Sequence, residues 1–191
     1  MERYVALLRG VNVGGKNVLP MRELAAIFAG AGCVDVVTYI QSGNVVFGAT
    51  GQCVAALAPV VEAGIRERFG IGSPVVVRSA AEMRRVLAAN RFAGAPEEML
   101  HVYFLRDAPA MAKVRGLDDG RSAPDAFAVV GREIFLHLPA GMARTKLTNG
   151  YFDKALGTVC TARNWKTVAK LTAMLDGDGG VTRRGSPSSF S

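Results

Sequence analysis

Side chains able to bind an anion lie close together near the start of the chain, in residues 9–17. Arg9, Asn12 and Lys16 carry cationic or amide donors. These donors are interleaved with three glycines, Gly10, Gly14 and Gly15. Because glycine has no Cβ, such a loop can adopt positive φ and bring backbone N–H groups close to a bound group. The stretch is therefore chemically suited to holding an anion.

The spacing from Gly10 to Lys16 also fits the G-x-x-x-x-G-K pattern of a nucleotide-binding P-loop. Three details argue against a P-loop. Asn17 stands where Ser or Thr would reach a magnesium ion, the expected helix begins only near Pro20, and the expected sheet is antiparallel. We therefore favour an anion-binding loop of another kind, and a plain strand-to-helix connection is the competing interpretation.

Further donors occur in segments distant in sequence. Ser42 and Asn44 lie at an expected hairpin tip, where both residue types are ordinary turn formers. Arg144 and Lys146 lie in a basic loop before an expected helix, whose free N–H groups would suit a phosphate.

The closing helix supplies the last candidates. We expect Arg163 to align with Lys166 and Lys170 along one side of this helix, with Asn164 at its start. Such a stripe is more often a solvated face than a ligand site. A phosphate contact and a solvated face therefore both stay open for these residues.

Catalytic and metal sites receive little support. A nucleophilic Ser42 would need a base within reach, but His101 and His137 each alternate with apolar residues along an expected strand. With two histidines, scattered cysteines and no clustered carboxylates, we expect no metal site. The sequence assigns no cofactor.

Composition indicates a globular protein of the cytoplasm. Half of the 191 residues are hydrophobic, and the three cysteines are dispersed, which suits reduced thiols. We see no secretory signal and no run of about eighteen apolar residues, so we expect a soluble protein without a membrane partner. The formal net charge is +7, and five of these charges lie in residues 141–191. This excess favours phosphate-bearing partners, although a solvated basic surface accounts for it equally.

Periodicity and turn signals predict the same order of elements twice: strand, helix, hairpin, helix, strand and an appended helix. In the first half these elements cover residues 4–8, 20–30, 34–41, 45–47, 54–69 and 75–78, followed by a helix with the capping box Ser79 and Glu82. In the second half they cover residues 100–105, 111–116, 127–130, 133–138, 148–156, 159–161 and 164–175. We infer a duplication at a spacing of about ninety residues, longer than any solenoid repeat.

Each unit fits an α+β, ferredoxin-like βαββαβ plan, also called the α/β plait, with an antiparallel sheet. We predict a first subdomain over residues 1–90 with an appended helix, and a second over residues 91–176 with the C-terminal helix. Residues 177–191, rich in Gly and Ser, are predicted to be a flexible tail.

Four segments resemble a bacterial family known as domain of unknown function 1697: LRGVNVGGKN (8–17), YIQSGN (39–44), TKL (145–147) and TARNWKT (161–167). The resemblance runs from Tyr4 to about Leu175. It implies two ferredoxin-type plaits in one chain and marks these segments as signatures, but it implies no activity. Thr145, Ala162 and Lys166 depart from the usual Ser, Thr and Asn.

We therefore expect side chains from these segments to converge on one cleft between the plaits and to bind a phosphate-bearing ligand, such as a nucleotide. The expected ligand-binding residues are Arg9, Asn12, Gly14, Gly15, Lys16, Ser42, Asn44, Lys146, Arg163 and Asn164. The alternatives are an RNA- or nucleic-acid-binding protein, a transferase or hydrolase acting on a nucleotide-like substrate, and a protein-interaction module. Because no RNP-like aromatic pattern occurs, we favour a small ligand.

Overall fold

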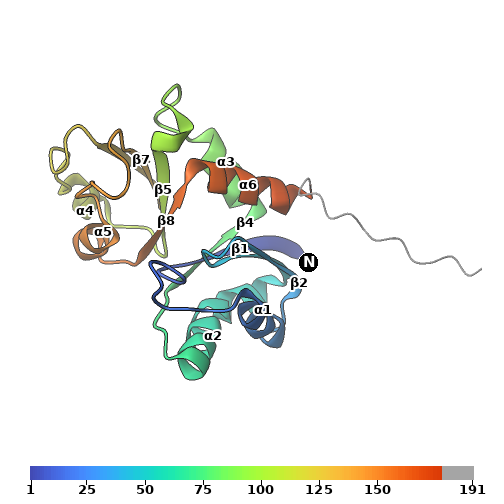
Figure 1. The fold of residues 1–191 in the computed structure, drawn as a ribbon. Coiled ribbons are helices and arrows are strands. Elements are labelled where there is room, and N and C mark those ends of the chain that lie inside the picture. The colour runs from blue at the N-terminus through green and yellow to red at the C-terminus, as the bar shows by residue number, and fades with distance from the viewer. Residues whose placement is uncertain (178–191) are drawn as a thin grey trace, which may run out of the picture.

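A computed structural model describes residues 1–177, which form two four-stranded antiparallel sheets with helices around and between them (Figure 1). The first unit comprises β1 (Glu2–Leu8), α1 (Met21–Gly30), β2 (Val34–Tyr39), β3 (Asn44–Ala49), α2 (Gly51–Phe69), β4 (Val75–Ser79) and α3 (Ala80–Ala88). The second comprises η1 (Glu97–Met99), β5 (Leu100–Leu105), α4 (Met111–Arg115), β6 (Ala126–Val130), β7 (Glu133–His137), α5 (Asn149–Leu156), β8 (Cys160–Asn164) and α6 (Trp165–Asp176).

The two sheets have the same topology. Their strand orders are β2-β3-β1-β4 and β6-β7-β5-β8, and every neighbouring pair is antiparallel. The predicted duplicated βαββαβ plan with an added C-terminal helix is therefore confirmed. The boundary between subdomains 1–90 and 91–176 stays a prediction. Apart from Gly177, which ends α6, the predicted flexible tail lies outside the described residues.

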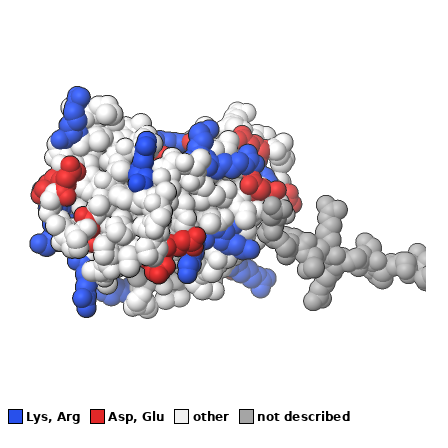
Figure 2. Space-filling view, turned by 90° about the horizontal axis from the view of Figure 1, so that it is seen from above, with Lys and Arg blue, Asp and Glu red and all other residues white. Residues whose placement is uncertain are grey.

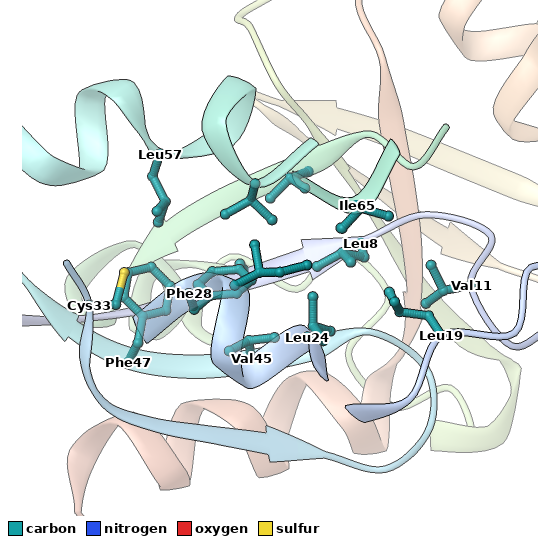
Figure 3. Packing of buried hydrophobic residues seen from close by; sticks show 14 of the residues in the cluster. Leu8, Val11, Leu19, Leu24, Phe28, Cys33, Val45, Phe47, Leu57 and Ile65 are labelled. Carbon is teal, nitrogen blue, oxygen red and sulfur yellow. The ribbon is translucent and has the colours of Figure 1, made fainter. Parts of the chain in front are cut away.

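Both faces of β1 are buried, which explains its continuous apolar run. Tyr4, Ala6 and Leu8 face α1 and α2, and they pack with residues such as Phe28 and Phe47 in the core of the first plait (Figure 3). The second plait has its own core beneath α4 and α5, in which Tyr103 packs against Phe152.

A third core joins the two plaits. Helices α3 and α6 cross each other between the sheets, as the green and orange helices at the centre of Figure 1 show. Val5 and Leu7 of β1 contribute to this core from one sheet, and Val102 and Phe104 of β5 from the other. The inner face of each sheet is therefore covered by helices, and the two units share one buried layer.

The end of the second unit differs from the prediction. The strand predicted over residues 159–161 extends through Asn164, so Arg163 pairs with Val102 in the sheet and does not lie on the closing helix. The predicted stripe of Arg163, Lys166 and Lys170 is therefore wrong. Apolar periodicity misses the end of this strand because Thr161 and Arg163, which point to its buried side, are polar and are buried with hydrogen bonds.

Other local predictions agree with the structure. Ser79 and Glu82 form the predicted capping box at the start of α3. Cys33, Cys53 and Cys160 are free thiols, although Cys53 is only half-buried. Within residues 1–177, every helix is too short or too polar to cross a bilayer.

The shared core predicts that the described units unfold together. Phe104→Ala removes a fully buried ring from this core and should lower the free energy of unfolding by about 3–5 kcal/mol. Urea unfolding followed by Trp165 fluorescence and by far-UV circular dichroism should give coincident transitions that shift together. Val60→Ala, at an exposed position of α2, should change stability by no more than about 0.5 kcal/mol. A shift seen by only one probe would contradict a shared core.

Candidate functional site

The arginine at position 163 is the most connected polar side chain between the units. Arg163 is 8% exposed, and its guanidinium reaches from β8 to the ends of strands in the first plait. It donates hydrogen bonds to Asn44 Oδ1 at 2.5 Å, to Thr161 Oγ1 and to the backbone oxygens of Leu8, Ser42, Gly43 and Ala162. These bonds engage all three guanidinium nitrogens, so Arg163 holds the hairpin tip at Ser42–Asn44 against the second unit.

Arg78 is the counterpart of Arg163 in the first unit. Each is the penultimate residue of the fourth strand of its plait and precedes the residue that caps the appended helix. Arg78 Nη2 donates to the oxygen of Leu105, the last residue of β5, as Arg163 Nη2 donates to that of Leu8, the last residue of β1. Each unit thus inserts one buried arginine into the other.

A second pair of arginines repeats this exchange. Arg9 and Arg106 directly follow the first strand of their plaits. Arg9 pairs with Asp153 of α5, and Arg106 pairs with Glu62 of α2. Because each carboxylate belongs to the other unit, the duplication extends from the order of elements to the residues of the interface.

The two interfaces differ in whether a carboxylate contacts the buried arginine. Glu133 lies opposite the penultimate residue of β5 and accepts from Arg78 Nε at 2.8 Å, whereas Asn44 occupies the equivalent place opposite β1 and accepts from Arg163 Nε. Burial lowers the pKa of Arg163 to about 10. It also lowers the pKa of Arg78, but there Glu133 opposes the effect. Among the described residues, the Arg163 interface therefore keeps a buried positive charge without a carboxylate in contact, unlike the Arg78 interface.

A similar difference occurs at the appended helices. Glu82 is the third residue of α3, where it accepts from Ser79 N–H and pairs with Arg132. Thr167 is the third residue of α6 and so takes the place of Glu82. Gly43 takes the hairpin position of Arg132, because the backbone oxygens of Gly43 and Arg132 each accept from the N–H of the last residue of the first strand of a plait. The Glu82–Arg132 ion pair has no equivalent in the Arg163 interface within residues 1–177.

A cleft of about 440 Å³ lies beside Arg163, and we call it the Arg163 cleft. Its lining contains neither an acidic residue nor a histidine. It is lined by Leu8, Arg9, Gly10, Val11, Val13, Ile40, Ser42, Asn44, Tyr103, Met142, Asn149, Thr161, Ala162, Arg163, Asn164 and Thr167. Arg9 is paired with Asp153, so Arg163 gives the cleft its net positive charge.

Five of the expected ligand-binding residues line this cleft: Arg9, Ser42, Asn44, Arg163 and Asn164. Their roles differ. The side chains of Asn44 and Arg163 are buried and bonded to each other, while Ser42 and Asn164 are exposed. Asn164 Oδ1 caps α6 by accepting from Thr167 N–H at 2.8 Å, which leaves its amide nitrogen as a donor.

The glycine-rich loop does not line the cleft with its donors. Gly14 and Gly15, both at positive φ, form a two-residue turn that Lys16 N–H closes by donating to Val13 at 3.0 Å. Asn12 Nδ2 donates to the oxygens of Leu19 and Gln41, so the Asn12 amide fixes the loop to the hairpin. The helix begins only at Met21, as the argument against a P-loop requires.

Lys146 also lies outside the cleft lining. Its side chain is exposed, its backbone N–H donates to Ser122, and its oxygen accepts from Arg121 Nε. Lys146 therefore lies on the outer surface of the second plait, although Met142 of the same loop lines the cleft.

Several lining residues were missed by sequence reasoning. Asn149 and Thr167 lie in the first turns of α5 and α6, so the positive ends of two helix dipoles face the cleft. The capping residues Thr148 and Asn164 were the available signal for these helix starts. Tyr103, whose hydroxyl donates to Leu147, and Met142 gave no such signal.

Comparison with known proteins gives the family and supports the fold. This chain belongs to the family described as Protein of unknown function (DUF1697), which matches residues 1–135. The structure of the conserved bacterial protein SP0830 from Streptococcus pneumoniae is similar, with a TM-score of 0.66, over 91% of this chain and 98% of that chain. At 22% identity, this similarity shows the fold. No functionally curated protein matches the chain.

The Arg163 contacts predict a large loss of stability on a conservative change. Arg163→Lys keeps the charge, but an ammonium cannot reach the carbonyls that the planar guanidinium serves, so buried acceptors lose their donors. We expect the free energy of unfolding to fall by at least about 3 kcal/mol in urea titrations. Lys166→Ala, on the exposed side of α6, should have an effect of at most about 0.5 kcal/mol. Equal stability of the two variants would show that Arg163 does not join the units.

Proposed function

We propose that this member of the DUF1697 family binds a small ligand through a phosphate or comparable anionic group in the Arg163 cleft. The observation that carries this proposal is the difference between two equivalent arginines. Arg78 is neutralised by Glu133, whereas the acceptors that Arg163 contacts within residues 1–177 are neutral. A bound anion would supply the negative charge that the second interface lacks.

The charge of Arg163 acts through space, because its own donors are already engaged. At an effective dielectric constant of about 20, a unit anion roughly 6 Å away would gain about 3 kcal/mol. Direct hydrogen bonds would come from the Asn164 amide, the Ser42 hydroxyl and the part of the Arg9 guanidinium that does not face Asp153.

The structure gives less support to the other candidate functions. RNA binding on an open sheet face would require exposed aromatics, but helices cover both faces of each central strand. In the view of Figure 2, lysines and arginines are dispersed among acidic residues and form no continuous track. A hydrolase using Ser42 would need a base, and the cleft lining offers neither a histidine nor a carboxylate.

The sharpest test places in the Arg163 cleft a carboxylate equivalent to Glu82 of the other interface. Thr167→Glu should place a carboxylate over Asn164 N–H, as Glu82 lies over Ser79 N–H, and should oppose the charge of Arg163 as Glu82 opposes that of Arg78. We would measure melting temperatures with inorganic phosphate, phenyl phosphate and adenosine monophosphate. A ligand at a hundred times its Kd should stabilise the wild-type chain by about 2.7 kcal/mol, or roughly 5–10 °C, and should not shift the variant.

The matched control is Lys166→Gln. It lowers the net charge by one unit, as Thr167→Glu does, but one residue away on the exposed side of α6, and it should keep the ligand-induced shift. If no anion raises the wild-type melting temperature, or if Thr167→Glu responds like the wild type, the proposal is wrong. Binding of a short RNA whose affinity falls steeply with salt and is unchanged by Thr167→Glu would instead favour the nucleic-acid alternative.

A further inference from the structure

The Arg163 cleft has an apolar wall that an anion alone would not use. Val13 and Ile40, from the glycine-rich hairpin and the β2–β3 loop, line the cleft and are 64% and 50% exposed. They are among the few large apolar side chains that the described residues leave in water. Met142 of the second unit also lines the cleft, so the lining offers hydrocarbon surface beside its polar groups.

The backbone of Ile40 adopts an unfavourable conformation. Its φ is +49°, in the left-handed region that β-branched residues avoid, and such a conformation costs about 1–3 kcal/mol. The flanking residues are fixed from both sides, because Gln41 accepts from the Asn12 amide and Tyr39 accepts from the Asn44 amide. The surrounding hydrogen bonds therefore hold Ile40, with its strained backbone, at the edge of the cleft.

The loops that carry Ile40 and Val13 are shorter in the second plait. Tyr39 pairs with Asn44 across a four-residue loop, whereas Val130 pairs with Glu133 across a two-residue turn. The connection after the first strand is also longer in the first unit, at residues 9–20 against 106–110. The segments that carry Ile40 and Val13 are thus extensions of the duplicated plan, and both extensions border the Arg163 cleft.

We propose that Ile40 and Val13 are specificity-determining residues that bind a planar or hydrocarbon group attached to the anion. This inference rests on the proposed function. The cleft, at about 440 Å³, is large enough for a small organic ligand and far larger than one phosphate needs. Its positive charge lies at Arg163 and its apolar wall at the rim, so the matching ligand class is a monoester of phosphate with an aromatic or aliphatic group.

The experiment compares two phosphate monoesters that differ in their organic part. Calorimetric titration of the wild-type chain should give a Kd for phenyl phosphate at least about tenfold lower than for glycerol 1-phosphate, because only the ring can bury apolar surface against Ile40. Ile40→Asn removes this surface while tolerating positive φ. It should abolish the preference, leave glycerol phosphate binding unchanged and raise the melting temperature as the backbone strain is relieved.

The matched control is Val18→Asn, since Val18 lies in the same connection as Val13, is 66% exposed against 64% for Val13, and lies outside the cleft lining. It should keep the preference for phenyl phosphate. If the wild type binds both esters equally, or if Ile40→Asn keeps the preference, the specificity role is wrong and the anion site stands. If the wild type binds neither ester nor inorganic phosphate, the proposed function itself fails.

Discussion

The structure depends on a buried guanidinium that serves backbone carbonyls of the opposite plait. Arg163 reaches the end of β1 and the β2–β3 tip, where it donates to the backbone oxygens of Leu8, Ser42 and Gly43. Arg78 does the same for the end of β5. Because each unit completes the hydrogen bonding of the other, the two plaits form one structure whose central layer is α3 and α6.

Duplication followed by divergence accounts for the difference between the two interfaces. On one side, Glu82 and Glu133 supply internal carboxylates to Arg132 and Arg78. On the other, the equivalent places hold Thr167 and Asn44, and the bordering loops are longer. The same scaffold therefore produces one interface whose arginines are paired with carboxylates of the chain and one that is polar, positive and accessible.

The sequence predicts the repeated plan well, because its signals are local. The apolar runs of β1 and β5 and the capping box of Ser79 indicate their elements directly. The burial of Arg163 could not be predicted, since its acceptors are backbone atoms about 120–155 residues away that follow no residue pattern. The convergence of Arg9, Ser42, Asn44, Arg163 and Asn164 agrees with the family signatures, whereas the donors of residues 12–16 mainly close a turn.

The reciprocal ion pairs across the interface have a kinetic consequence. Arg9–Asp153 ties β1 to α5, and Arg106–Glu62 ties β5 to α2, so rocking of one plait against the other would have to break both ion pairs. These ion pairs therefore oppose a change in the width of the Arg163 cleft. For the ligand proposed above, such a pre-organised cleft would require no slow closure, and the dissociation rate, more than the association rate, would distinguish one compound from another.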